Sequence, residues 1–170
     1  MARPPSCVIG VDAALRNTGV GVVVSGPAAP AVREFGVIRC PDGWPHTRAL
    51  RHLHDELAGW LQRHRPDALA IEGLFYCRNV RTAIALGEAR GVVLMTAAAA
   101  GVPVFEYAPR SVKQAMVGSG GARKEQVAKM VVRMTGLDRE PSEDAADALA
   151  VALCHAQRRA SIWPGGAAAL

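Results

Sequence analysis

The stretch that decides the fold lies near the start of the chain and reads CVIGVDAALRNTGVGVVVSGPAAPAVREFGVI over residues 7–38. It contains three short runs rich in apolar and β-branched residues, at 7–12, 19–25 and 32–38, and short turns separate them. β-Branched residues favour strands, and short turns between such runs favour hairpins. The stretch therefore predicts three strands in an antiparallel meander.

Helical and strand patterns alternate over the rest of the chain. Helices are predicted at 47–63, 79–100, 110–117 and 122–135, and a last helix starts after Pro141-Ser142 and runs to about Arg159. Strands are predicted at 68–71 and 102–107. This order predicts an α/β fold with a mixed five-stranded sheet, antiparallel in one half and parallel in the other. Helices should flank the sheet on both faces.

Length and composition point to one globular unit. The chain has 170 residues, of which 50% are hydrophobic, and this is enough to bury one core. We expect a single domain over residues 1–159 and an uncharged tail over residues 160–170.

The sequence also indicates where the protein works. No apolar run approaches the roughly 18–20 residues that span a bilayer, so no membrane partner is expected. Gly10 and Asp12 interrupt the apolar stretch that follows the N-terminus, which argues against a signal peptide. The four cysteines form no C-x-x-C pair, so we expect reduced thiols in a cytoplasmic protein, without a disulfide or a zinc site.

The charge balance is compatible with an anionic partner. The chain carries 20 basic and 15 acidic residues, a net charge of +5. Six basic residues gather between residues 110 and 133 beside a single acid, Glu125; they are Arg110, Lys113, Arg123, Lys124, Lys129 and Arg133. Such a cluster favours phosphate binding that weakens with salt, although a solvated helix face has the same composition.

Two acidic residues, Asp12 and Glu72, stand at the ends of apolar predicted strands. In α/β sheets, binding sites form beyond the ends of the strands. A carboxylate that is buried there needs a cation or a basic partner. Each residue taken alone fits either a metal ligand or an ordinary solvated or ion-paired acid.

A second acidic pair, Asp144 and Asp147, falls in the first turns of the last predicted helix. Their spacing of three residues puts both carboxylates on one helix face. Acids at this end of a helix also stabilise its dipole, which is a sufficient explanation for Glu143. Four carboxylates from separate segments nevertheless suit Mg²⁺, or Mn²⁺ in its place. Two such ions per subunit could support phosphodiester hydrolysis.

Neighbouring residues could bind a nucleic acid. Lys124 follows the flexible GSGG segment at 118–121 and could reach a scissile phosphate or offset repulsion between carboxylates. Phe75 and Arg78 follow Glu72 closely, and an aromatic side chain beside a phosphate site favours base stacking. Phe75 could equally close the hydrophobic core.

Together, these residues resemble the RuvC family of Holliday-junction resolvases, from about Val8 to His155. Five blocks carry the resemblance: IGVDAALRNTGVGVV at 9–23, ALAIEGLFYCRN at 68–79, ALGEARGV at 85–92, VFEYAPRSVKQAMVGSGGARKEQV at 104–127 and EDAADALAVALCHA at 143–156. Each block alone is weak evidence, whereas their order and spacing together are highly specific.

The resemblance implies a ribonuclease H-like fold and a homodimer that acts on four-way DNA junctions in recombination and repair. Each subunit would nick one of two strands of like polarity. Asp12, Glu72, Asp144 and Asp147 match the metal-binding acids of the family. Lys113 and Lys124 match its basic active-site positions, and Phe75 matches an aromatic that contacts bases near the junction centre.

Two partner interactions are also implied by the resemblance. The helix at 79–100 is the expected dimer element, since its small residues allow close approach. The family works with a junction-binding and branch-migrating motor complex of the RuvA and RuvB type.

One position departs from the family pattern. Ala13-Ala14 follows the first acid, where the family usually has Pro-Gly, and this could alter the turn beside Asp12. A junction-binding protein with reduced or absent cleavage is therefore an alternative. An actin-like ATPase is a third hypothesis, because Gly19 and Gly21 after Asp12 resemble a phosphate-binding hairpin. Those enzymes need two such domains.

Overall fold

The structure is a computed structural model and describes residues 6–26, 29–73, 79–160 and 169–170. Within these residues the strands are β1 (Ser6–Asp12), β2 (Asn17–Ser25), β3 (Ala31–Arg39), β4 (Ala68–Glu72) and β5 (Val104–Tyr107). The helices are α1 (His46–His64), α2 (Val80–Ala99), α3 (Pro109–Val117), α4 (Lys124–Thr135) and α5 (Glu143–Ala160). Every predicted element is present, with small differences at the ends.

The strands form one mixed sheet in the order β3-β2-β1-β4-β5. β1 pairs antiparallel with β2, from Ser6↔Ser25 to Asp12↔Gly19, and β2 pairs antiparallel with β3. β1 pairs parallel with β4, and β4 with β5. The predicted division into an antiparallel and a parallel half is confirmed. Because β1 and β4 are parallel neighbours, their carboxyl ends meet at the same edge of the sheet.

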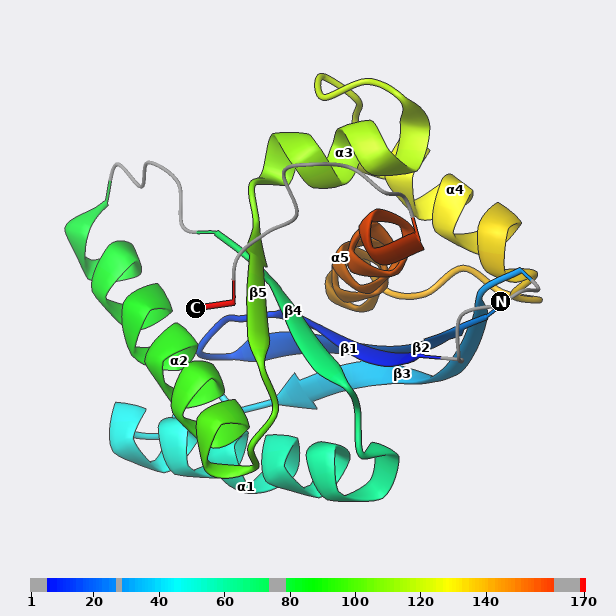
Figure 1. Cartoon of the computed structure of the whole chain (residues 1–170). Coiled ribbons are helices and arrows are strands. Elements are labelled where there is room, and N and C mark those ends of the chain that lie inside the picture. Colours follow the sequence, from blue (N-terminus) through cyan, green and yellow to red (C-terminus); the bar gives the residue numbers. More distant parts are fainter. Residues whose placement is uncertain (1–5, 27–28, 74–78, 161–168) are drawn as a thin grey trace.

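Helices cover both faces of the sheet, as predicted (Figure 1). α1 and α2 pack on one face and α3, α4 and α5 on the other, and each face has its own cluster of buried hydrophobic side chains. Along β4 the side chains alternate: Leu69 and Ile71 join the α1/α2 cluster, and Ala70 joins the α5 cluster. Glu72 follows Ile71, so its side chain faces α5.

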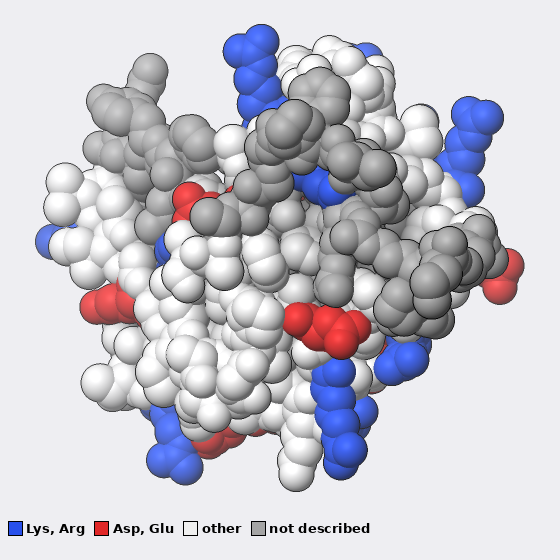
Figure 2. Space-filling model, viewed as in Figure 1, with Lys and Arg blue, Asp and Glu red and all other residues white. Residues whose placement is uncertain are grey.

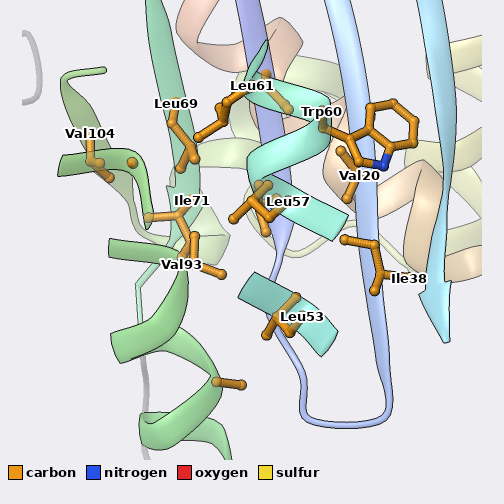
Figure 3. Close-up of a cluster of buried hydrophobic side chains, with 14 of the residues drawn as sticks. Val20, Ile38, Leu53, Leu57, Trp60, Leu61, Leu69, Ile71, Val93 and Val104 are labelled. Carbon is orange, nitrogen blue, oxygen red and sulfur yellow. The ribbon is translucent and has the colours of Figure 1, made fainter. Parts of the chain in front are cut away.

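The α1/α2 cluster packs one face of the sheet tightly against these two helices. Leu53 and Leu57 of α1 are fully buried, and they pack in the same cluster as Leu69 and Ile71 of β4 (Figure 3). Burying one such side chain contributes about 1.5–3 kcal/mol. These buried leucines therefore anchor α1, and the ends of β1 and β4 extend from a packed layer.

α5 lies unusually close to the sheet on the other face. A Cβ atom added to Gly10 of β1 would lie 2.0 Å from the Ala148 main-chain oxygen, and one added to Gly19 of β2 would lie 1.9 Å from that of Asp144. Any side chain at these two positions would push the helix away. The glycines of the strands and the alanines of α5 thus bring the first turns of α5 down onto β1 and β2.

α2 corrects the expectation that no apolar segment approaches the length that spans a bilayer. Its 20 residues are long and apolar enough to span a membrane by length and composition, with a mean hydropathy of 1.3. Glu88 and Arg90 interrupt the run, which made it look shorter in the sequence. Arg90 pairs with Glu106 of β5, and Ala89 and Val93 are buried in the α1/α2 cluster. These contacts pack α2 against the sheet.

The end of the chain returns to the sheet edge. Ala169 forms a bridge with Phe105, and the Leu170 main-chain nitrogen donates to the Val104 oxygen at 2.9 Å. These contacts cover part of the edge of β5. The division into a domain over 1–159 and a tail over 160–170 stays a prediction.

Three of the four cysteines lie within the described residues. Cys7, Cys40 and Cys154 are free, and Cys40 and Cys154 are buried. Cys77 lies outside the described residues.

Candidate active site

The site begins where β1 and β4 end. Asp12 is the last residue of β1 and Glu72 the last of β4, and these strands are parallel neighbours. Both side chains are partly buried. The face of the sheet toward which Glu72 points is the one that α5 covers. The strand-end positions noted in the sequence therefore come together in space.

α5 supplies further acids to the same place. The close approach at Gly19 sets the main chain of Asp144 against β2, directly across from Asp12, the partner of Gly19 in the sheet. Asp147 follows one turn later and lines a pocket with Asp12 and Glu72. Because the residues on the packing face of α5 are small, the helix lies close to the sheet and brings its acids next to the strand ends.

The pocket has a volume of about 210 Å³ and brings together residues from five elements. Its charged lining combines three acids with two lysines, and its apolar lining comes from α3, α4 and α5. The lining residues are Asp12, Glu72, Asp147, Lys113, Lys124, Pro109, Val112, Val127 and Ala150. Five of the predicted site residues thus face one small, partly enclosed space.

Asp144 does not line this pocket and lies beside it. It lines a larger adjacent pocket of about 690 Å³, together with the turn after β1 and the start of α2. Its negative charge still acts on Asp12, whose pKa it raises. The four predicted acids therefore interact electrostatically, but three of them line one pocket and Asp144 lines the next.

Charge repulsion and burial perturb the acids of the site. Burial, followed by the charges of Asp147 and Asp144, raises the pKa of Asp12 from its ordinary 3.8 to about 6. Burial, followed by the charge of Asp12, raises the pKa of Glu72 from its ordinary 4.5 to about 7. The pocket holds more negative charge than its two lysines offset.

Lys124 is held between two acids of α5. Its Nζ lies 2.7 Å from Oε1 of Glu143 and 3.0 Å from Oδ2 of Asp147. The hydrogen bond to Glu143 is the largest cause of the raised pKa of Lys124, so this lysine stays charged. The sequence analysis gave Glu143 only a helix-dipole role. Its spacing of four residues before Asp147 places both acids on one helix face and could have indicated the contact with Lys124.

The donor set fits a hard divalent cation. Carboxylate oxygens are the ligands that Mg²⁺ and Mn²⁺ prefer. The raised pKa values of Asp12 and Glu72 mark uncompensated negative charge that a cation would relieve. Within the described ranges, however, no three His, Cys, Asp or Glu side chains stand close enough to hold an ion as they are placed. Lys124, paired with Asp147, provides the nearest positive charge instead.

Comparisons with known proteins agree with this site. The family model "Crossover junction endodeoxyribonuclease RuvC" matches residues 8–155. The chain belongs to the RuvC family. The RuvC of Syntrophomonas wolfei is 46% identical over 149 residues, which is 87% of each chain. The RuvC of Pelotomaculum thermopropionicum is 45% identical over 150 residues, 88% of this chain and 92% of that relative.

Solved structures support the same family and fold. The RuvC of Thermus thermophilus in complex with a Holliday junction substrate has a TM-score of 0.88 and 38% identity, covering 97% of this chain and 99% of that chain. The yeast mitochondrial Holliday junction resolvase Ydc2 has a TM-score of 0.63 and only 12% identity, so it shares the fold alone. The predicted ribonuclease H-like architecture is confirmed.

The turn that contains Ala13-Ala14 is held by hydrogen bonds with a buried threonine. Thr18, which is 1% exposed, donates from Oγ1 to the Ala14 oxygen at 2.5 Å, and the Ala14 nitrogen donates to Oγ1 at 3.2 Å. Among the described non-glycine residues, positive φ occurs at Arg65 alone, so neither alanine adopts the backbone conformation that favours glycine. The hydrogen bonds of Thr18 close the turn around Ala13-Ala14.

Two predicted residues are not placed. Phe75 and Arg78 lie outside the described residues, which stop at Gly73 and resume at Asn79. Their predicted contacts with DNA therefore stay predictions of the RuvC resemblance.

Proposed function

We propose that this chain is a metal-dependent endonuclease that resolves four-way DNA junctions by paired nicks during recombination and repair. The observation that carries the proposal is the acidic pocket. Asp12, Glu72 and Asp147 share it with Lys113 and Lys124, in a chain 46% identical to a crossover junction endodeoxyribonuclease. The 38% identical Thermus protein was solved with a Holliday junction, which supports the same substrate here.

We propose Mg²⁺ as the cofactor, with Mn²⁺ able to substitute and two ions per subunit. Asp12, Glu72 and Asp147 would hold them, with Asp144 contributing from the adjacent position. Such ions, when bound, supply charge stabilisation and a water of lowered pKa for attack on a phosphodiester. The chemistry of the donor set and the raised pKa values of Asp12 and Glu72 support this assignment.

The two lysines give the pocket its selectivity for a phosphate. Lys113 comes from α3 and Lys124 from the first residue of α4, so they approach the acids from two helices. A DNA phosphate can compete with Glu143 and Asp147 for the Lys124 ammonium. Of these two acids, Glu143 is the more open to solvent, since its side chain is 69% exposed against 22% for Asp147. Lys124 would then neutralise the phosphate as charge develops on it.

DNA beyond the scissile phosphate would lie along α3 and α4. These helices and the loop between them carry the six basic residues found between 110 and 133. Binding through them should weaken as salt rises, because association releases counterions from the DNA and the gain from this release falls at higher salt concentration. Phe75 and Arg78 are proposed to contact bases and backbone near the junction centre, as the family resemblance implies.

We propose a homodimer that forms through α2. Its exposed face carries Val80 (71% exposed), Ile84 (56%) and Met95 (53%). Gly87 and Gly91 have open space where a side chain would stand, which permits close approach of a second helix. Uncharged side chains dominate the side of the molecule that α2 occupies (Figure 2). A motor complex of the RuvA and RuvB type, and a cytoplasmic location, are proposed from the family.

The experiment that tests the function uses a labelled immobile four-way junction and a matched duplex, each with Mg²⁺ or with EDTA. Paired nicks on the junction alone, only with Mg²⁺, are expected. Tight junction binding without nicks at any Mg²⁺ or Mn²⁺ concentration would instead establish the non-cleaving alternative. Neither alanine of Ala13-Ala14 has a positive φ, and this supports the cleaving function over that alternative.

A further inference from the structure

Arg90 is a buried charged residue of α2, and the proposed reaction gives it no role in the acidic pocket. It lies in the block ALGEARGV at 85–92, and its side chain is 11% exposed. Nη1 donates to the main-chain oxygen of Glu72 at 2.8 Å, and Nη2 donates to Oε2 of Glu106 in an ion pair. Arg90 therefore joins α2 to the ends of both β4 and β5.

The carbonyl that Arg90 holds stands where pairing with β1 ends. The pairing of β1 with β4 runs from Val8↔Ala68 to Val11↔Ile71 and stops before Glu72. On the other side, pairing with β5 includes Glu72↔Tyr107. The main chain at Glu72 therefore has a sheet partner on one side, and the bond from Arg90 is an additional restraint on it.

Arg90 reaches Glu72 from the face opposite the acidic pocket. The carboxylate of Glu72 lines the pocket under α5, whereas α2 packs on the other face of the sheet. On that face Gly73 leaves room for Glu106, because a Cβ on Gly73 would lie 2.8 Å from Oε1 of Glu106. The missing side chain at Gly73 lets Glu106 extend toward Arg90.

An arginine suits this position for a chemical reason. Its planar guanidinium presents several N–H donors in a fixed fork, so it can donate hydrogen bonds to a carbonyl and a carboxylate at the same time. A buried cation is costly unless both its charge and its donors are satisfied. Glu106 and the Glu72 carbonyl meet these two needs, and together they hold Arg90 in one orientation. A lysine keeps the charge but has no fork.

We infer that Arg90, held by Glu106, is a positioning residue that fixes the main chain at Glu72 and so aims its carboxylate into the pocket. Arg90 does not line the pocket and acts only through Glu72. The inference rests on the metal-binding role proposed for Glu72. Through Arg90, α2, the proposed dimer helix, is also connected to the main chain of Glu72 at the acidic site.

The test compares Arg90→Gln, Arg90→Lys and Glu106→Gln with a matched control, Arg51→Gln, which breaks an exposed ion pair with Asp55 on α1. Mn²⁺ affinity is measured by calorimetry without DNA, and the Mg²⁺ concentration for half-maximal junction cleavage is measured separately. Arg90→Gln should weaken metal binding about 10–100-fold, the range for losing a group that orients a metal ligand. Arg90→Lys and Glu106→Gln should cause smaller losses. Junction binding in EDTA should not change, and the control should match wild type throughout.

A double variant separates positioning from general support of the fold. In a Glu72→Gln background, Arg90→Gln should weaken Mn²⁺ binding no further, although its effect on Tm should persist. Wild-type Mn²⁺ affinity in Arg90→Gln, or an equal added loss in both backgrounds, would overturn the inference. If Arg90→Gln does not fold, Glu106→Gln answers the same question, because it leaves Arg90 in place. If Glu72→Gln alone binds Mn²⁺ and cleaves like wild type, the proposed role of Glu72 fails first, without any Arg90 variant.

Discussion

Replacing Asp12 with asparagine should stabilise the metal-free protein, and only at higher pH. Asp12 is ionised at neutral pH in a pocket that opposes its charge, which raises its pKa from 3.8 to about 6. At about 1.4 kcal/mol per pKa unit, this difference costs the folded state about 3 kcal/mol. Asp12 is partly exposed, and solvent screening reduces the cost, so we expect Asp12→Asn to add about 1–3 kcal/mol.

The sign of the pH dependence follows from where the proton is held. Between pH 3.8 and about 6 the folded protein keeps the Asp12 proton that the unfolded chain has lost. Stability of the wild type in EDTA should therefore fall as pH rises through this window, and the fall due to Asp12 should be complete above about pH 6. The gain from Asp12→Asn should be small near pH 4 and full at pH 7 and above.

The assay is chemical and thermal denaturation in EDTA at a series of pH values, repeated with saturating Mg²⁺. A gain of 1 kcal/mol corresponds to a rise in Tm of about 2–4 °C for a chain of this size. Mg²⁺ should stabilise wild type and have much less effect on Asp12→Asn, because a ligand stabilises the state that binds it. Asp42→Asn, in the exposed turn before α1, is the control. A gain that is the same at every pH, or a loss at pH 7, would refute the reasoning.

Three further predictions concern catalysis and packing. Glu72→Gln should abolish junction cleavage and preserve junction binding in gel-shift assays, because the amide keeps the shape but not the charge; cleavage at the wild-type rate would end its assignment as a metal ligand. Lys124→Ala should lower the single-turnover rate about 100-fold with a much smaller effect on affinity, as expected for a group that stabilises developing charge. A proportional loss of binding would make Lys124 a general phosphate contact. Gly19→Ala should destabilise the fold by about 3 kcal/mol, the upper end of the usual cost of overpacking, because its Cβ would meet the main chain of Asp144 at 1.9 Å and strand and helix must separate. Gly43→Ala, where nothing lies within 4 Å, should change the Tm little, and an equal effect of both substitutions would contradict the packing argument.

Local patterns in the sequence determined the elements and their order. The β-branched runs of 7–38 predicted three strands, and the helical pattern at 47–63 predicted a helix, and the structure contains all four elements. These patterns are reliable because burial of one face imposes a period on the chain itself. The strand-end positions of Asp12 and Glu72 were visible for the same reason, since an apolar run that stops at an acid marks both the strand and its end.

Only the tertiary structure decided how the acids are arranged. Asp144 and Asp147 looked equivalent in the sequence, yet Asp147 lines the pocket and Asp144 the one beside it. The difference arises because Gly19 lets the first turn of α5 rest on β2, and spacing along the helix carries no information about that contact.

The partners of the charged groups were hidden for a related reason. Lys124 of α4 pairs with Glu143 of α5, and Arg90 of α2 contacts Glu72 and Glu106 at the ends of β4 and β5. The sequence could show that these charged residues exist, and the family resemblance could show that several belong to one site. The packing of segments far apart in the chain decides which charged groups pair with one another. Only that packing sets the distances over which ion pairs and hydrogen bonds act.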